Sequence, residues 1–363
     1  MATFSFGAGQ SNYTGEVLND LLSYTAEENE TYRHGLIHVE TGIQKKLALP
    51  LVQSGKIIQD RIPTPAQATG ADLSANSVGS YRFTERYLEP QDFMIYMEFN
   101  PRDFESYYRQ FQPDGTLVFR KLDPRVQATM LRLLMEGKES YINNAIWRSA
   151  TGTQKAKIKT ATSTSQDIIG GDVQEGPLKY FGGAIYRMLY NHARKSSDTG
   201  VDLEEFNGGQ ITLTGNTDFA DGKAVSDELY KMWQACPPHI RYNKDLCFLM
   251  DYTSWDKYDQ YCTTQLYKYT DNRDENQRMF RGKRILPMTA LPENTIILGV
   301  FNNTRASNLW MGLDYADAEN VIQVDKLQAN SELYFFKALL KMDVNIVRPK
   351  EIVAHLPFTY SAD

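Results

Sequence analysis

The sequence predicts an α+β fold in which one segment of the chain extends away from the rest. Three observations support this prediction. Two strand-like segments, residues 43–60 and 81–100, flank a polar tip at 62–80, and a strongly periodic helix follows at 123–149. Shorter helices and strands then alternate, which predicts a central mixed sheet with helices packed outside it.

The first 40 residues begin with a lead rich in Gly, Ser and Asn, followed by a short amphipathic pattern. Leu18, Leu21 and Leu22 would lie on one face of a helix. A short helix on such a lead suits an arm that docks elsewhere. A terminal helix that folds onto its own domain explains the same periodicity.

The two strand-like segments predict a long β-hairpin whose tip has little to pack against. The tip, PTPAQATGADLSANSVGS, contains Pro63, Pro65, Gly70 and Gly79 and favours turns and extended backbone. At ~3.3 Å per residue each arm reaches roughly 55 Å, and an isolated two-stranded ribbon is marginally stable unless one face is covered. We therefore expect another subunit to cover the hairpin. For the tip, a disordered surface loop is the alternative.

Charged residues of both signs lie on the two arms at strand spacing, where they can specify a partner. We expect these residues, together with the three leucines of the amino-terminal helix, to make contacts between subunits. The charged candidates are Lys56, Asp60, Arg61, Arg82, Glu85 and Arg86.

The strongest helix signal spans residues 123–149. Asp123 is a good N-cap, and Pro124 suits the first helical position. Apolar residues then recur at helical spacing, and the helix would be ~40 Å long at 1.5 Å per residue. Gly137 weakens its middle.

Beyond this helix, short elements follow in alternation. We expect helices at 177–194, 225–235 and 252–261, and strands at 155–162, 210–214, 245–251, 284–287, 295–301 and 309–313. The carboxy-terminal run predicts two final strands, 333–340 and 344–353, which are separated by charged residues at 341–343.

Composition is that of an ordinary soluble globular protein with 363 residues, 42% of them hydrophobic and 23% charged. The 39 basic and 45 acidic residues give a net charge of −6, which argues against tight binding of a phosphate backbone. No stretch approaches the ~18 apolar residues of a membrane span, and the start lacks a signal-peptide pattern. The three cysteines lack metal-site spacing and predict buried thiols.

Segments that resemble catalytic or ligand-binding motifs do not have the residues or the spacing that those motifs require. Gly222-Lys223-Ala224 lacks the hydroxyl residue of a P-loop, and residues 216–228 resemble a calcium loop only loosely, since Ala220 occupies a ligand position. This segment predicts a polar turn that caps the next helix. His34 and His38 lie in an extended pattern rather than on a helix. We therefore predict no catalytic residue, cofactor or metal site.

The order of these parts resembles the major capsid proteins of tailed bacteriophages, which have the Hong Kong phage-type capsid fold. The resemblance covers nearly the whole chain and is most specific near the carboxy terminus. There FRGKRILPMTALPENTIILGVFNNTRASNLWMGLDY and ELYFFKALLKMDVNIVRPKEIV resemble the family's order of a strand, a turn into an apolar strand, an Asn-Leu-x-x-Gly segment and final strands.

The resemblance implies a division of the chain into four parts. Residues 1–40 would be the N-arm, and 41–100 the extended loop (E-loop), a hairpin that lies on a neighbouring subunit. Residues 101–176 and 331–363 would form the peripheral domain, with 123–149 as its spine helix. Residues 177–330 would form the axial domain with its central mixed sheet.

The resemblance also implies a function and partners. The chain would self-assemble as hexamers and pentamers into an icosahedral capsid in the host bacterial cytoplasm, enclosing double-stranded DNA without sequence-specific binding. A portal and possible decoration proteins are implied partners. A separate scaffolding protein is implied as well, because no long charged helical segment precedes the arm. Since Lys45, Lys46 and Lys56 lie on the arms and none on the tip, we expect non-covalent assembly.

Two other functions compete with the capsid hypothesis. An encapsulin-like nanocompartment shell would share the fold but enclose enzymes. A carbohydrate-active enzyme would use the abundant aromatic residues, although the spacing of Trp147, Trp233, Trp255 and Trp310 through predicted helices and strands favours core packing.

Overall fold

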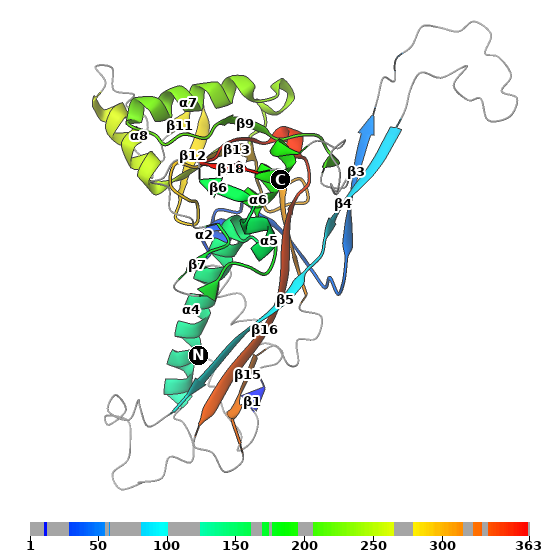
Figure 1. The fold of residues 1–363 in the computed structure, drawn as a ribbon, viewed down its shortest axis with the longest axis vertical. Coiled ribbons are helices and arrows are strands. Elements are labelled where there is room, and N and C mark those ends of the chain that lie inside the picture. The colour runs from blue at the N-terminus through cyan, green and yellow to red at the C-terminus, as the bar shows by residue number, and fades with distance from the viewer. Residues whose placement is uncertain are drawn as a thin grey trace, which may run out of the picture.

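The computed structural model consists of an upper body, a stalk that descends from it and a hairpin that projects to one side (Figure 1). It describes residues 11–12, 29–54, 58, 81–100, 124–160, 169–173, 176–194, 206–264, 279–314, 322–328 and 333–361. The predicted amino-terminal helix and the hairpin tip lie outside these residues.

The stalk contains a six-stranded sheet centred on one 13-residue strand, β16 (Tyr334–Ile346). On one edge, β16 pairs with β15 (Ile322–Lys326) at its start and with β14 (Leu309–Leu313) at its end. On the other edge it pairs with β5 (Gln91–Phe99). Two outer strands complete the sheet, β1 (Ser11–Asn12) beside β15 and β2 (His38–Thr41) beside β14.

The upper body contains the second six-stranded sheet, in the order β11-β12-β10-β13-β17-β9. Its central strand β10 (Leu246–Asp251) is buried at every position. It runs parallel to β12 and antiparallel to β13, so the predicted mixed sheet is confirmed. The other strands are β9 (Thr212–Gly215), β11 (Met279–Phe280), β12 (Lys283–Met288), β13 (Ile296–Val300) and β17 (Val353–His355).

Apolar side chains on both faces of β10 explain why this sheet is buried. Leu246 and Phe248 belong to a core shared with α7 (Gly222–Ala235) and α8 (Tyr252–Thr264). Cys247 and Leu249 point the other way, into the larger core with α6 (Ala184–Ala193) and the end of the long helix. Such a double-sided apolar strand is typical of a fully covered sheet.

The long helix α4 (Pro124–Arg148) confirms the helix predicted at 123–149. Its last turns are buried, and they hold the short helix α2 (Glu30–Arg33) in place. Thr31 Oγ1 donates to Asn143 Oδ1 at 2.7 Å and accepts from Trp147 Nε1 at 3.1 Å. The chain before the stalk sheet is therefore tied to the helix beside it.

Short elements complete the described fold. They are the hairpin strands β3 (Leu47–Ser54) and β4 (Tyr81–Leu88), α5 (Gly152–Lys155), β6 (Ile158–Thr160), β7 (Asp172–Val173), β8 (Gly176–Pro177), β18 (Phe358–Tyr360) and two 3₁₀ turns, η4 (Pro238–Ile240) and η6 (Pro349–Glu351).

Three predicted boundaries are wrong. The strand expected at 344–353 ends at Ile346, and a 3₁₀ turn at Pro349–Glu351 separates it from β17. The helix expected at 177–194 begins only at Ala184, because Gly183 packs so closely on the Ser149 backbone that a Cβ would lie 2.8 Å from that nitrogen. The break expected at 341–343 is absent, and β16 runs straight through it. The charged residues there have partners, since Lys341 Nζ lies 3.4 Å from Asp314 and Asp343 pairs with Arg187 at 2.9 Å.

The second predicted arm, residues 81–100, is two strands in different sheets rather than one. β4 pairs with β3 in the hairpin, whereas β5 pairs with β16 along nine residues of the stalk. The change occurs at Glu89 and Pro90, where the Glu89 N–H donates to Asp343 Oδ2 at 2.9 Å. The paired part of the hairpin is therefore shorter than residues 43–100 suggested.

The sheets also do not follow the predicted domain boundaries. β14 and β15 fall within residues 177–330 but join the stalk sheet. β17 falls within 331–363 but joins the sheet of the upper body, between β13 and β9. The chain crosses between the two sheets more often than the predicted division allows.

Candidate assembly interface

The β3–β4 hairpin has two chemically different faces. Paired residues alternate between the faces along the antiparallel ladder. The inner face carries Leu49 opposite Arg86 and Leu47 opposite Leu88. Leu49 and Leu88 are buried in a small cluster with Ile43 and Val347, so this face packs on the body.

A buried polar network fixes the base of the hairpin. Arg86 Nη2 donates to Asn345 Oδ1 at 2.9 Å, and Arg86 Nη1 donates to the Asn207 carbonyl at 3.2 Å. Asn345 Nδ2 in turn donates to the Tyr87 carbonyl at 2.7 Å. Because buried polar groups need their partners, this network sets the direction in which the hairpin leaves the body.

The outer face of the hairpin is apolar and exposed. Val52 pairs with Phe83, and Tyr81 follows on the same face one pair further out. Their exposed fractions are 55% for Val52, 74% for Phe83 and 65% for Tyr81. We call these three residues the hairpin patch. It lies on the part of β3 and β4 that projects from the body (Figure 1).

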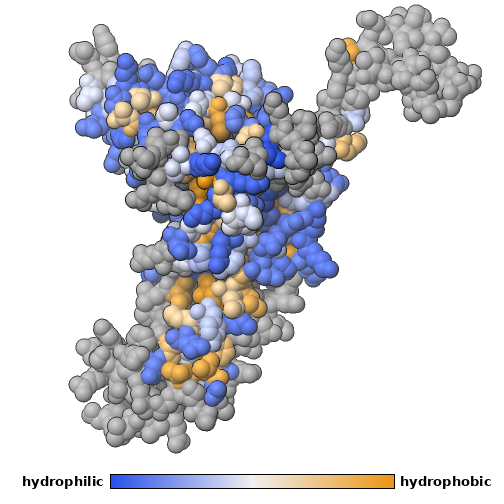
Figure 2. All heavy atoms as spheres, in the orientation of Figure 1, coloured by the Kyte–Doolittle hydropathy of each residue, from blue (hydrophilic) through white to orange (hydrophobic). Residues whose placement is uncertain are grey.

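A second exposed apolar strip lies on the stalk sheet. Met94 on β5 is opposite Leu339 on β16, and they are 57% and 48% exposed. Tyr96, on the same face, stacks on Phe335 with ring centroids 6.1 Å apart. We call these four residues the stalk patch. Figure 2 shows apolar side chains at the surface of the lower half of the molecule, mixed with hydrophilic ones.

The opposite face of β5 is covered. Phe93 stacks on Tyr180 with centroids 5.2 Å apart and lies 5.7 Å from the ring of Tyr141 on α4. Burial raises the pKa of Tyr141, whose hydroxyl donates to the Pro177 carbonyl at 3.1 Å. Among the described residues, the stalk sheet is therefore buried on the face toward α4 and exposes apolar side chains on the other face.

Most of the predicted contact residues lie outside the described part of the chain. Leu18, Leu21, Leu22, Lys56, Asp60 and Arg61 are in that group. Arg82 pairs through its backbone with Gln53. Glu85 is exposed and accepts a hydrogen bond from the Tyr87 hydroxyl at 2.7 Å.

Arg86 was predicted to contact a neighbouring subunit, and this prediction is wrong. Its side chain is only 2% exposed and binds its own subunit. The alternation of β4 explains the error, because Arg86 lies on the inner face with Leu88. The sequence analysis missed the hairpin patch, although the alternation of Tyr81 and Phe83 with polar residues was a usable signal.

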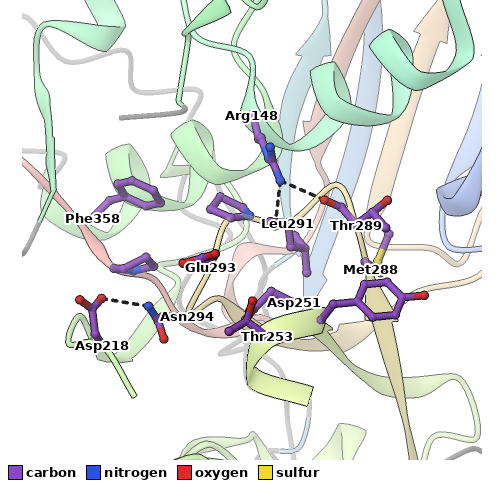
Figure 3. A pocket seen from close by; sticks show the side chains of 13 residues that line it. Arg148, Asp218, Asp251, Thr253, Met288, Thr289, Leu291, Glu293, Asn294 and Phe358 are labelled. Atoms are coloured by element: carbon purple, nitrogen blue, oxygen red, sulfur yellow. Dashed lines mark hydrogen bonds between the residues drawn. The ribbon is translucent and has the colours of Figure 1, made fainter. Parts of the chain in front are cut away.

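A cleft of ≈ 590 Å³ lies where α4, α8 and the β12–β13 turn meet (Figure 3). Arg148, at the end of α4, donates to the carbonyls of Thr289, Ala290 and Leu291. Asp251 is buried, which raises its pKa, and it accepts from the Ser254 and Thr295 N–H groups at 3.0 Å. Both side chains stabilise the turn and the start of α8.

Metal and membrane signals are equally limited in the described residues. Among those residues no group of three or more His, Cys, Asp or Glu side chains is placed to hold a metal ion. Asp221 Oδ1 accepts from the Ala224 N–H at 2.8 Å, so the calcium-like loop caps α7 as predicted. No helix in the described ranges is both long enough and apolar enough to cross a bilayer.

Two of the three cysteines, Cys236 and Cys247, are buried as predicted, and Cys262 is half-buried. Burial raises the pKa of the Cys247 thiol to about 12. A thiol with such a pKa is protonated at neutral pH and behaves as a small apolar side chain.

No family model and no curated protein match this sequence. Solved structures do match it over nearly its whole length. The capsid of cyanophage A-1(L) aligns with a TM-score of 0.54 at 12% identity, covering 91% of this chain and 92% of that chain. This chain has the tailed-phage major capsid fold.

A second structure matches the capsid fold equally well. A chain from the satellite phage P4 procapsid, whose structure includes the size determination (Sid) protein, aligns with a TM-score of 0.52 at 10% identity. The alignment covers 96% of this chain and 93% of that chain. At such identities the likeness shows the fold, and the function must be argued from the surfaces described above.

Proposed function

We propose that this chain is the structural shell protein of a virion, which self-assembles as hexamers and pentamers into an icosahedral capsid around double-stranded DNA. The observation that carries this proposal is the hairpin patch on a chain with a capsid fold. Its three apolar side chains are displayed on a hairpin whose base is fixed by the Arg86 network. Fixing the base reduces the ordering cost of binding.

The two patches suggest how copies associate. The hairpin patch lies on the arm at the right of Figure 1, and β5 and β16 run down the stalk. A chain that displays apolar strips on two different elements can bury each one on another copy. Different surfaces that meet in this way form a heterologous contact, which closes into a ring when the rotation between copies permits.

The energy per contact is modest, and repetition supplies the rest. Burying one large apolar side chain contributes roughly 1.5–3 kcal/mol, and association costs offset part of this. A closed shell repeats each contact in every subunit, so weak interfaces combine by multivalency.

We carry the predicted regions into this proposal with three changes: Arg86 is no longer a contact residue, the extended loop keeps β3 and β4 while β5 belongs to the stalk sheet, and the two domains exchange strands. Residues 1–40 act as an N-arm and the chain from β3 to β4 as the extended loop, with Leu18, Leu21, Leu22, Lys56, Asp60, Arg61, Arg82 and Glu85 as contact residues. The peripheral domain corresponds to α4 and the stalk sheet, so it also takes in β14 and β15. The axial domain corresponds to the upper sheet and takes in β17.

The proposed cargo and partners follow from charge and from assembly. A net charge of −6 suits a wall that encloses DNA without gripping its phosphates. A scaffolding protein, a portal and decoration proteins are the proposed partners in the host bacterial cytoplasm.

The decisive experiment is assembly of the purified full-length protein, with and without the phage's scaffolding protein. Sedimentation and negative-stain electron microscopy should show capsomers or closed shells. Phe83→Glu should abolish them while leaving the melting temperature of the subunit within about 1 °C, because this side chain is already exposed.

Tyr252→Glu is the matched control for this variant. Tyr252 is 46% exposed on α8 and lies outside both patches, so the variant should assemble like the wild type. A wild-type protein that stays monomeric at high concentration with the scaffold present would contradict the proposal. If Phe83→Glu formed normal shells, the hairpin patch would not be an assembly contact.

A further inference from the structure

An unusual turn joins β11 to β12 at the edge of the upper sheet. Phe280 pairs with Lys283, which leaves Arg281 and Gly282 as a two-residue loop. Both have positive φ, 50° and 74°, as in a type I′ turn. Asn, Asp and Gly adopt the left-handed conformation readily, whereas arginine does so at a cost. A long cationic side chain at this position therefore suggests a use for it.

Stacking on two aromatic rings holds the Arg281 side chain in place. Its guanidinium carbon lies 5.1 Å from the centroid of Tyr230 and 6.0 Å from that of Trp233. Trp233 also packs against the core under α7 and is stacked on by Arg241 at 5.9 Å. A guanidinium group on an aromatic face keeps its N–H edge available for a bidentate acceptor.

The donors of Arg241 and Arg281 are used differently. Arg241 donates to the carbonyls of Cys236 and Gln234 and so caps the end of α7. Arg281 is exposed and has no hydrogen bond or ion pair in the part of the chain that the structure describes. Among those residues its side chain is held by stacking on the two rings.

The described stretches of sequence that carry Arg281 and the residues it stacks on are basic in a chain that is acidic overall. Residues 230–245 and 279–284 contain one acidic residue, Asp245, and six basic ones. The rest of the chain is therefore more acidic than its net charge of −6 suggests. The basic residues are Lys231, Arg241, Lys244, Arg281, Lys283 and Arg284.

We propose that Arg281 binds a carboxylate of a second copy of this chain, at a contact distinct from the hairpin and stalk patches. Charge complementarity favours this occupant, because every further copy supplies a chain that is acidic outside these stretches. In the described residues, Asp227, Asp256 and Glu293 are exposed carboxylates without an ion pair. The inference rests on the proposed self-assembly.

The first test compares three full-length proteins by light scattering and sedimentation. Arg281→Asn removes the guanidinium and suits the turn, so its melting temperature should equal or exceed that of the wild type. Its critical concentration for assembly should rise about tenfold or more. Lys244→Ala removes a neighbouring exposed charge that is not stacked, and should change the critical concentration less than about twofold.

The second test identifies the partner group. Arg281→Lys keeps the charge and offers an amine that carbodiimide couples to a touching carboxylate, forming an amide and releasing the urea derived from the reagent. Shells made from an equal mixture of ¹⁴N and ¹⁵N copies should give mixed-isotope cross-linked peptides through residue 281.

Each other outcome has a defined meaning. This inference would be overturned if the wild type forms shells and Arg281→Asn assembles equally well. It would also be overturned if the Arg281→Lys shells give no cross-link between copies. Either result would leave the proposed function standing. Arg281-dependent binding of a DNA duplex at 150 mM salt, with assembly unchanged, would assign the site to nucleic acid instead. Failure of the wild type to associate would contradict both proposals.

Discussion

The two six-stranded sheets of this protein have opposite relations to solvent. In the upper sheet, β10 is buried at all six positions, with α7 and α8 on one face and the larger core on the other. In the stalk sheet, β5 alternates between covered side chains such as Phe93 and exposed ones such as Met94. Among the described residues, the upper sheet is covered on both faces, and the stalk sheet exposes apolar side chains on one.

This difference separates residues that fold the subunit from residues that would assemble it. Apolar side chains in the upper sheet stabilise the fold whether or not another copy is present. Those in the hairpin and stalk patches add little until a second surface covers them. Substitutions in the two regions should therefore act on different measurements, and the following predictions run from the largest effect on subunit stability to the smallest.

Phe248→Ala should destabilise the subunit most. Phe248 is fully buried on β10, and truncating such a side chain typically costs about 3–5 kcal/mol through lost burial and the cavity left behind. Urea unfolding of the unassembled protein measures this change. Phe83→Ala is the matched substitution on an exposed strand and should change the free energy of unfolding by less than about 0.5 kcal/mol. Equal losses of unfolding free energy in the two variants would contradict the proposed difference between the two regions.

Arg86→Met should cost about 3 kcal/mol, since the buried Asn345 Oδ1 loses its charged donor and keeps only the Ile346 N–H, and the partly buried Asn207 carbonyl loses its bond to the guanidinium. The loss should be local, so hydrogen exchange should accelerate at β3 and β4 and not at β10. Arg132→Met is the control, because Arg132 is exposed and its i,i+4 pair with Glu136 lies on the helix surface. Uniform acceleration across both sheets would show that the hairpin base is not an independent unit.

The sequence predicted well wherever one short-range pattern decides the structure. The N-cap, the proline and the helical spacing located α4 to within a residue at each end. The continuous apolar run of β10 predicted a buried strand. The order of these elements was enough to indicate the capsid fold.

The predictions from the sequence were wrong where the structure depends on partners that are distant in the sequence. Nothing near Lys341 reveals that Asp314 pairs with it, and nothing near Asp343 reveals Arg187, so β16 looked broken. Similarly, Arg86 looked like a surface charge because its partner Asn345 is 259 residues away. The candidate contacts on the hairpin were predicted from charge, whereas the described part of the hairpin displays apolar side chains.

A buried carboxylate in the upper body should make the free energy of unfolding of the subunit depend on pH. Burial alone would raise the pKa of Glu228, but hydrogen bonds from His355, Thr214 and Lys231 lower it from 4.5 to about 2. A carboxyl group with a depressed pKa stabilises the fold above its unfolded pKa and loses this contribution as the pH falls toward 2. Glu228→Gln should therefore cost about 3 kcal/mol at pH 7.

The difference between the two proteins should shrink between about pH 4.5 and pH 2. Urea unfolding of wild type and Glu228→Gln at pH 7, 5 and 3 measures it at low ionic strength. Asp227→Asn, one position away and exposed, is the control and should change the free energy of unfolding by less than about 0.5 kcal/mol. A constant difference at all three pH values would mean that Glu228 acts through packing rather than through its charge.

Leu339→Gln should have the smallest effect on the subunit and a clear effect on assembly. Leu339 is 48% exposed opposite Met94, so the free energy of unfolding should change by less than about 0.5 kcal/mol. If a second copy covers the stalk patch, the loss of one buried leucine at every contact should raise the critical concentration at least about tenfold. Tyr252→Gln is the control, because Tyr252 is similarly exposed but lies on α8, away from both patches. Normal assembly of Leu339→Gln, together with lost assembly of Phe83→Glu, would confine the contact to the hairpin and leave the stalk patch as an ordinary solvent-facing surface.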